Sequence, residues 1–330
     1  MMFNNPTPAG KVANREASYN NSDLVAKNPV LSSAKLIYYR LFAWTYAKMG
    51  SISSLVFVNS SWTEGHINDI WGVPDRTVRL FPPCNTATYL KITGPRSPSI
   101  VSVAQFRPEK DHKLQVEAFH CFVEKTGRSD VKLTLVGGVR NDEDKARVAE
   151  LQDLAKTLGV EELVEFEVSV PYTRLHEILS QSLIGLHTMW NEHFGIGVVE
   201  FMAAGIIPIA HNSGGPKMDI VVPGAGFLAT TKEQYCDHII RCLELDEEEL
   251  EEMRKRARNH VQSTFSDEAF REQFVRQCET VVYLDLEDHF VQDALSDDAD
   301  VLSEDADVLS DEIQSDDPQH QSEEEEFTEL

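Results

Sequence analysis

Between residues 99 and 210, short apolar runs alternate with longer segments in which apolar residues recur every three or four positions. The short runs predict buried strands, and the longer segments predict amphipathic helices. The expected strands are residues 100–105, 131–136, 164–168, 183–187 and 206–210. The expected helices are residues 112–125, 142–158, 172–181 and 194–204. This alternation predicts an α/β fold with parallel strands joined by right-handed crossovers.

The flanking regions have a less regular pattern. Residues 1–30 are rich in Asn, Ser and Pro and predict an irregular segment. Before the regular region we expect a helix at 34–48, strands at 55–58 and 78–81, and a helix that opens near residue 61. Ser61, followed three residues later by Glu64, predicts a capping box with Ser61 as the N-cap. After the regular region, helices are expected at 232–245, 247–264 and 266–283.

The net charge of −25 is unevenly distributed along the chain. Residues 285–330 hold 19 acidic side chains and no Lys or Arg, which leaves 36 acidic and 30 basic residues in the remainder. Self-repulsion and the lack of a burial pattern predict a disordered acidic tail at 286–330. The body is therefore expected to be a mildly acidic globular protein without a nucleic-acid partner.

The cysteines and the apolar segments indicate in which cellular compartment the protein is expected and whether it contacts a membrane. Five scattered cysteines without a C-x-x-C spacing indicate reduced thiols in a cytosolic setting, and no metal site is expected. We find no signal peptide and no run of about 20 apolar residues. Residues 36–49 are aromatic and contain Arg40 and Lys48. This segment is typical of a helix in a membrane interface or of an amphipathic helix packed on its own domain.

The most informative stretch runs from Trp190 to Gly205 and contains Glu192 and Glu200. Eight residues of helix rise about 12 Å, a length comparable to the hexose-to-ribose distance in a nucleotide sugar. One carboxylate could then receive sugar hydroxyls and the other ribose hydroxyls. Phe194 and Gly195 would present backbone N–H groups to a diphosphate at the start of the helix. Two glutamates at this spacing also occur by chance in an acidic chain, so the motif needs support from elsewhere.

That support comes from the ends of neighbouring strands. Arg107 and Lys110 follow the strand at 100–105, where ligands of doubly wound sheets bind, and could neutralise a leaving diphosphate. Gly138 ends the next strand and permits close backbone approach. His193 is expected either to line the donor pocket or to pack. Each signal alone is also compatible with a solvated turn, but their order on successive strand ends favours one ligand site.

The string EHFGIGVVE followed by FMAAG resembles the E-x7-E signature of family 4 retaining glycosyltransferases. With FRPEKDH and VNSSWT, the longer string LHTMWNEHFGIGVVEFMAAGIIPIAHNSGGPKMDIVVP is similar to the endoplasmic reticulum (ER) alpha-1,2-mannosyltransferases of dolichol-linked oligosaccharide assembly. This resemblance covers about residues 28–274. It implies a GT-B fold and a hexosyltransferase that moves mannose from GDP-mannose to the dolichol-diphosphate-linked core as its fourth and fifth mannose.

The resemblance also implies roles for individual residues. Glu192 would contact the donor mannose, Glu200 the ribose, and Lys110 the diphosphate, so that Glu192 and Lys110 are the expected catalytic residues. Arg107, Phe194, Gly195, Gly138 and His193 complete the expected donor site. The family usually has Gly-Arg where this chain has Ala104-Gln105. Retention would use the donor phosphate to help deprotonate the acceptor, with no cofactor and no metal.

The resemblance predicts the domain organisation and the setting. We expect a remnant of an N-terminal acceptor-side domain at 31–92, which would make that Rossmann-like domain truncated, and a complete C-terminal nucleotide-sugar-binding domain at 93–285. The expected location is the cytosolic face of the ER membrane, where other mannosyltransferases of the pathway are potential partners. Two alternatives stay open: a family 4 enzyme with another donor or acceptor, and an inactive fragment that binds partners through its tail.

Overall fold

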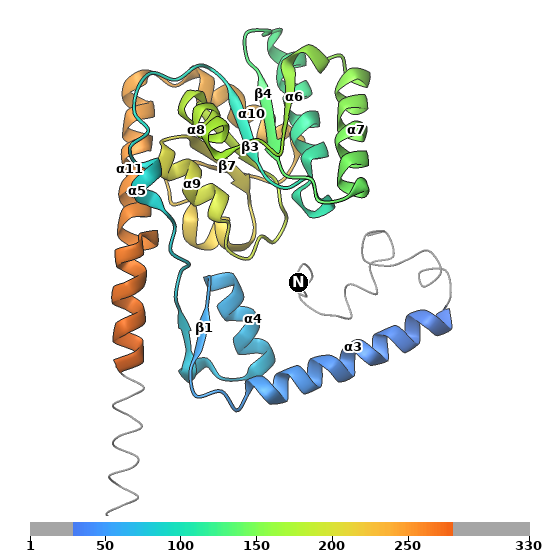
Figure 1. The fold of residues 1–330 in the computed structure, drawn as a ribbon, viewed down its shortest axis with the longest axis vertical. Helices are drawn as coiled ribbons and strands as arrows, with labels where there is room; N and C mark the ends of the chain where they lie inside the picture. The colour runs from blue at the N-terminus through green and yellow to red at the C-terminus, as the bar shows by residue number, and fades with distance from the viewer. Residues whose placement is uncertain (1–28, 280–330) are drawn as a thin grey trace, which may run out of the picture. The chain divides into compact units, whose positions relative to one another are not determined.

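A computed structural model describes residues 29–279 of the chain (Figure 1). Most of the predicted irregular N-terminal segment and the whole of the predicted acidic tail lie outside the described residues. The chain divides into one compact unit of residues 1–274 and a second of residues 275–330. All the elements named below belong to the first unit.

The centre of this unit is a six-stranded parallel sheet with the order β5-β4-β3-β6-β7-β8. Its strands are β3 (Ile100–Val103), β4 (Leu133–Gly137), β5 (Val164–Val168), β6 (Ile184–His187), β7 (Ile207–His211) and β8 (Phe227–Ala229). The order reverses between β3 and β6, where ligands of open parallel sheets bind. The α/β prediction is therefore confirmed, and β3 to β7 lie within a few residues of their expected positions.

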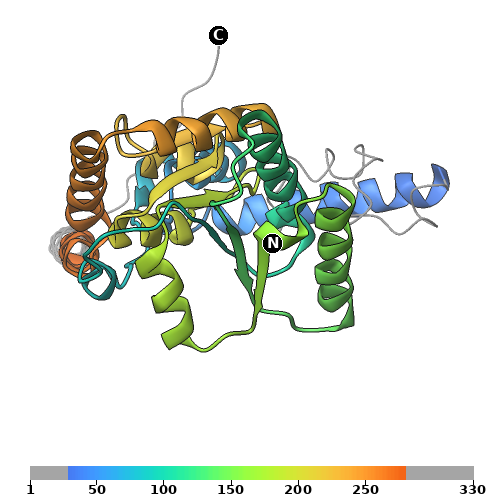
Figure 2. The same ribbon diagram turned by 90° about the horizontal axis from the view of Figure 1, so that it is seen from above.

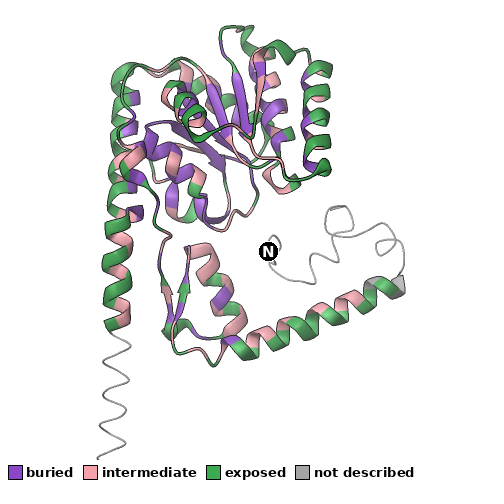
Figure 3. Cartoon of the chain, viewed as in Figure 1, coloured by how far each residue is buried: buried purple, intermediate pink, exposed green. Residues whose placement is uncertain are grey.

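Helices cover both faces of the sheet and form two separate cores (Figures 1 and 2). One face packs against α6 (His112–Thr126), α7 (Asp142–Thr157) and α10 (Lys232–Glu244). The other packs against α8 (Tyr172–Gln181), α9 (Ile196–Ala204) and α11 (Glu247–Phe265). Figure 3 shows the central strands of the sheet as almost wholly buried, and β3, β6 and β7 are accordingly short, mainly apolar runs.

A smaller group of elements precedes the sheet in sequence. It consists of α3 (Pro29–Gly50), β1 (Val56–Val58), α4 (Ser61–Trp71), the 3₁₀ turn η1 (Pro74–Arg76), β2 (Thr77–Arg79) and α5 (Thr86–Tyr89). Strands β1 and β2 pair in parallel. Several apolar side chains of α3 are exposed, including Ile37, Leu41 and Trp44. Within residues 29–279, no helix is both long and apolar enough to span a bilayer.

The predicted cap of α4 is wrong by one residue. Ser60 is the N-cap, and its side chain accepts a hydrogen bond from the Thr63 N–H. Ser61 is already helical, and its own N–H donates to Asp219 instead. The Glu64 carboxylate lies 3.1 Å from the Arg79 Nε, so it does not complete a capping box. A long-range partner has thus replaced the local one that the sequence pattern indicated.

Two further expectations need correction. Helix α9 begins at Ile196 rather than at residue 194, because Gly195 has a φ of 107° and ends the preceding loop in a left-handed conformation. Strand β8 was not predicted, since three apolar residues are too short to show a period. The other short elements are the 3₁₀ turns η2 (Pro108–Lys110) and η3 (Glu161–Leu163) and the π-helical turn η4 (Pro216–Ile220). Residues 267–274 are helical, as expected, and residues 280–283 of that predicted helix lie outside the described part.

Candidate active site

A cavity of about 570 Å³ lies at the carboxyl ends of β3 and β6, where the strand order reverses. Six of the predicted site residues line it: Lys110, Glu192, His193, Phe194, Gly195 and Glu200. Asn59, Pro82, Gln105 and His187 also contribute to its wall. The structure therefore brings together residues that come from four different segments of the chain.

Lys110 and Glu192 form the charged centre of this cavity. The Lys110 Nζ lies 2.6 Å from the Glu192 Oε2 and 3.1 Å from the Met189 Sδ. The His187 Nε2 lies 3.4 Å from the same Glu192 oxygen. Burial raises the pKa of Glu192, but the His187 hydrogen bond and the Lys110 charge more than offset it, and the pKa falls to about 2. Glu192 is therefore a carboxylate at any physiological pH.

The loop that carries Lys110 is tied to the end of β6. The Thr188 hydroxyl donates to the Lys110 carbonyl at 2.7 Å and accepts from the Gln115 side chain at 2.8 Å. Lys110 belongs to η2, which leads into α6 through Asp111 in a left-handed conformation with a φ of 48°. These contacts fix the backbone from which Lys110 reaches Glu192.

Glu200 lies one turn inside α9 and has a different partner. The Tyr89 hydroxyl donates to the Glu200 Oε1 at 3.4 Å. Burial raises the pKa of Glu200, and the Tyr89 hydrogen bond opposes that rise. Tyr89 was missed by the sequence reasoning because it lies 111 residues from Glu200 in a short helix without a motif.

The first turn of α9 offers backbone N–H groups to the cavity. Gly195 is its N-cap and supplies no side-chain hydrogen bond, whereas helices α4, α6, α7, α10 and α11 each begin with a side chain that accepts from their first turn. Gly195, Ile196 and Gly197 line the cavity. The start of a helix carries partial positive charge, so this turn suits a phosphate or diphosphate.

The loop at residues 190–195, called the donor loop after its predicted role, packs against the segment 213–220, which we call the support segment. The Gly215 N–H donates to the Glu192 carbonyl at 2.8 Å, and the Asn191 N–H donates to the Ser213 hydroxyl at 2.8 Å. A Cβ on Gly215 would lie 2.3 Å from the Phe194 carbonyl oxygen. The close approach of the two backbones thus requires glycine at this position.

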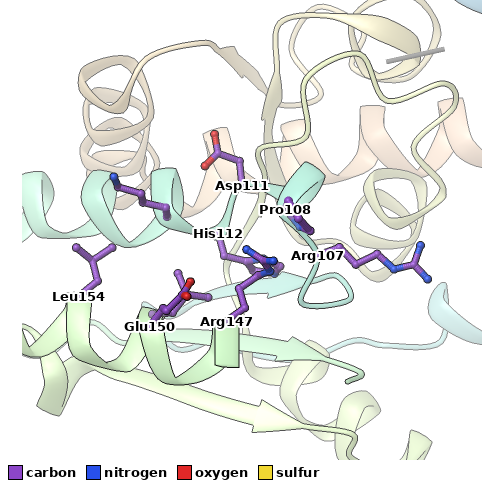
Figure 4. Close-up of a pocket in the computed structure, with 9 residues that line it drawn as sticks. Arg107, Pro108, Asp111, His112, Arg147, Glu150 and Leu154 are labelled. Atoms are coloured by element: carbon purple, nitrogen blue, oxygen red, sulfur yellow. The ribbon is translucent and has the colours of Figure 1, made fainter. Parts of the chain in front are cut away.

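Arg107 and Gly138, two predicted donor-site residues, do not line this cavity. Arg107 lies in a second cavity of about 330 Å³, together with Asp111, His112, Arg147 and Glu150 (Figure 4). In that view the Arg107 guanidinium points away from Arg147 and Glu150. The charged side chains of the second cavity therefore do not converge on one point. Gly138 follows β4, and its carbonyl accepts from the Phe106 N–H at 3.3 Å.

His187 could have been found from the sequence, since it ends a strand that was predicted and precedes the donor loop. The position of a histidine at one strand end, however, gives no indication that it faces Glu192 rather than a metal. Among residues 29–279, no group of three His, Cys, Asp or Glu side chains is arranged to hold a metal ion.

Relatives of known name match most of this chain. A GDP-Man:Man(3)GlcNAc(2)-PP-Dol alpha-1,2-mannosyltransferase from Xenopus laevis is 48% identical over 280 residues, which are 81% of this chain and 57% of that protein. The Homo sapiens protein of the same name gives the same figures, and the one from Dictyostelium discoideum is 42% identical over 279 residues. The chain therefore spans little more than half the length of these relatives.

Solved structures with the same fold are more distant in sequence. A Rickettsia africae glycosyltransferase superposes with a TM-score of 0.65 at 17% identity and covers 78% of this chain and 75% of its own. Anabaena HepE in complex with UDP and glucose gives a TM-score of 0.61 at 20% identity, with coverage of 73% and 68%. These likenesses confirm the predicted GT-B fold.

Two family models match the sequence. The model described as ALG11 mannosyltransferase N-terminus matches residues 9–71. The model described as Glycosyl transferases group 1 matches residues 92–260, a range that includes Lys110 and the whole donor loop. On the strength of this match, which covers half of the chain, the protein belongs to the group 1 glycosyltransferase family.

Proposed function

We propose that this chain binds GDP-mannose in the cavity at the ends of β3 and β6 and acts as a retaining alpha-1,2-mannosyltransferase. The observation that carries the proposal is the arrangement of Lys110, Glu192 and Glu200 around the uncapped first turn of α9. The names of the relatives support GDP-mannose as the donor and a dolichol-diphosphate-linked oligosaccharide as the acceptor. The products would be the fourth and fifth mannose of that oligosaccharide.

In this proposal each group has a defined task. The N–H groups at the start of α9 and the Lys110 ammonium hold the diphosphate and neutralise its charge as the sugar leaves, without a metal or cofactor. The Glu200 carboxylate accepts hydrogen bonds from the ribose hydroxyls. The ionised Glu192, held by Lys110 and His187, accepts hydrogen bonds from the mannose hydroxyls. Arg107 and Gly138 have no task in this scheme.

The exposed face of α3 supports a membrane surface as the place of action. Leu41 and Trp44 of α3 are 62% and 60% exposed, and Lys35, Arg40 and Lys48 belong to the same helix. Aromatic side chains combined with cationic ones favour the interface of an anionic membrane. We propose the cytosolic face of the ER membrane, where a dolichol-linked acceptor would be available.

Calorimetric titration of the folded chain with GDP-mannose and, separately, with UDP-glucose tests the donor assignment. We expect selective binding of GDP-mannose. Selective binding of UDP-glucose would instead favour another donor. Failure of a folded chain to bind either nucleotide sugar would contradict the proposed donor site and favour a partner-binding role.

Transfer is tested separately with a synthetic phytanyl-diphosphate-linked Man(3)GlcNAc(2) acceptor. We expect an added mannose that an alpha-1,2-specific mannosidase removes. Donor binding without transfer to this acceptor would contradict the acceptor assignment and leave the donor assignment intact.

A further inference from the structure

The ring of Trp62 lies against the ring of His193 in the donor loop. The two ring centroids are 4.8 Å apart and the planes differ by 19°, which is a stacked arrangement. The edge of the Trp62 ring also meets His66, with centroids 4.0 Å apart and an interplanar angle of 85°. His193 lines the donor cavity directly beside Glu192. Trp62 thus contacts the cavity wall from α4, an element outside the six-stranded sheet and its helices.

The start of α4 is held in place by a buried carboxylate. The Ser61 N–H donates to the Asp219 Oδ2 at 2.8 Å, and the Ser61 hydroxyl donates to the other Asp219 oxygen. The Asp219 side chain is only 3% exposed. A carboxylate at this position also interacts favourably with the positive end of the helix. The backbone next to Trp62 is therefore held by the hydrogen bonds between Ser61 and Asp219.

Asp219 belongs to the support segment, and the same segment holds the donor loop. Ser213 and Gly215 bind the backbone of Asn191 and Glu192, as described above. The His260 Nε2 donates to the Asp219 carbonyl at 3.0 Å and anchors the segment to α11. Eight consecutive residues thus set the positions of both stacked rings, Trp62 through α4 and His193 through the donor loop.

We propose that Trp62 is a positioning residue of the donor site, which fixes the His193 ring as the cavity wall next to the transferred sugar. This inference rests on the proposed function and extends it to a residue outside the donor-binding domain. Because His193 adjoins Glu192 rather than Glu200, Trp62 acts on the hexose end of the donor and leaves the nucleotide end unaffected.

The test compares the affinities for GDP-mannose and for GDP in the full chain. We expect Trp62→Ala to weaken GDP-mannose binding about threefold to tenfold, the range of one aromatic pair, and to change GDP binding less than about twofold. Trp62→Phe, which keeps a stacking ring, should restore most of the affinity. Trp44→Ala removes an exposed tryptophan of α3 and should bind both ligands as the wild type does.

A double-mutant cycle with His193→Ala separates positioning from general destabilisation. If Trp62 acts through His193, the double variant should bind GDP-mannose no more weakly than His193→Ala alone. Additive losses, or equal losses for GDP and GDP-mannose, would overturn the proposal. Should Trp62→Ala fail to fold, unchanged GDP-mannose affinity in His193→Ala would overturn it as well. A wild-type chain that binds no nucleotide sugar would refute the proposed function itself.

Discussion

The Lys110 ammonium and the Glu192 carboxylate lie 2.6 Å apart, although they are separated by 82 residues in the sequence. Each belongs to a loop at the end of a central strand, and each loop is held by backbone hydrogen bonds. The two loops therefore hold the Lys110 ammonium and the Glu192 carboxylate at a fixed distance from each other. In the proposed function, a donor that enters the cavity would meet its diphosphate partner and its sugar partner already in position, which would reduce the ordering cost of binding.

The two glutamates should respond differently to the same substitution. Glu200→Gln should weaken GDP and GDP-mannose binding alike, by about tenfold, because a charged acceptor for the ribose hydroxyls is lost. Glu192→Gln should weaken GDP-mannose binding and change GDP binding little. Calorimetry with both ligands measures this, and Glu124→Gln at an exposed site of α6 is the matched control. If both variants lost affinity for GDP and for GDP-mannose in the same proportions, the assignment of separate roles to the two glutamates would be wrong.

Because the pKa of Glu192 is lowered in the folded chain, the free energy of unfolding should depend on pH in the acid range. Its pKa is about 2 in the folded chain against an ordinary 4.5, so its contribution is present above pH 4.5 and is lost as the pH falls toward 2. The shift corresponds to at most about 3 kcal/mol. Urea denaturation of wild type and Glu192→Gln at pH 7, 4.5 and 3 should show a flatter pH dependence in the variant. Parallel curves would mean that the ion pair contributes no pH-dependent stability.

Gly215→Ala tests the close approach of the support segment to the donor loop. Gly215 has ordinary helical angles, so alanine fits its backbone, but the new Cβ would lie 2.3 Å from the Phe194 oxygen. We expect a loss of about 1–3 kcal/mol in the free energy of unfolding and weaker GDP-mannose binding. Gly65→Ala in α4, where a Cβ meets nothing within 4 Å, should instead stabilise by about 0.5–1 kcal/mol. Thermal and urea denaturation distinguish the two.

Arg96 should be a strong determinant of stability. Its guanidinium donates to the carbonyls of Leu179, Ser182 and Ala204, the last at the end of α9. Burial, with Arg254 and Arg258 nearby, lowers its pKa to about 10, so it stays charged at neutral pH. Arg96→Ala should cost about 2–4 kcal/mol of unfolding free energy, because the Leu179 and Ser182 carbonyls lose this donor, while the Ala204 carbonyl keeps Arg258. Arg271→Ala, at an exposed site, should change it by less than about 0.5 kcal/mol.

The sequence was sufficient to predict strands β3 to β7 and the loop at residues 190–195, although it did not reveal strand β8. Strands β3, β4, β6 and β7 are buried on both faces, so their apolar runs stand out from the amphipathic helices between them. The edge strand β5 is only partly buried, and its sequence alternates as VEFEV. Lys110, Glu192 and Glu200 follow or lie near strand ends, and the topology of a parallel sheet brings such positions together. The prediction that they share one cavity depended on these local patterns and on the resemblance to family 4 glycosyltransferases.

Other parts of the site depend on contacts that no local pattern records. Tyr89 reaches Glu200 across 111 residues, and Asp219 reaches Ser61 across 158. Asp219 also explains why the predicted cap of α4 was wrong, since a distant carboxylate took the N–H that a capping box would involve. Arg107 follows the same strand as Lys110, but it lies before η2 in an extended conformation and lines the second cavity, whereas Lys110 lines the first.

In the proposed function, the uncapped start of α9 links donor binding to folding. A helix whose first turn lacks a capping side chain is expected to fray more readily, and a bound diphosphate would take the place of that cap. In thermodynamic terms the donor is then a ligand of the folded state, which raises the unfolding free energy by RT ln(1 + [L]/Kd). Gly195 cannot easily be replaced by Ser or Asp to provide the cap, because its φ of 107° strains any other residue. The melting temperature of the chain should therefore report how fully its donor site is occupied.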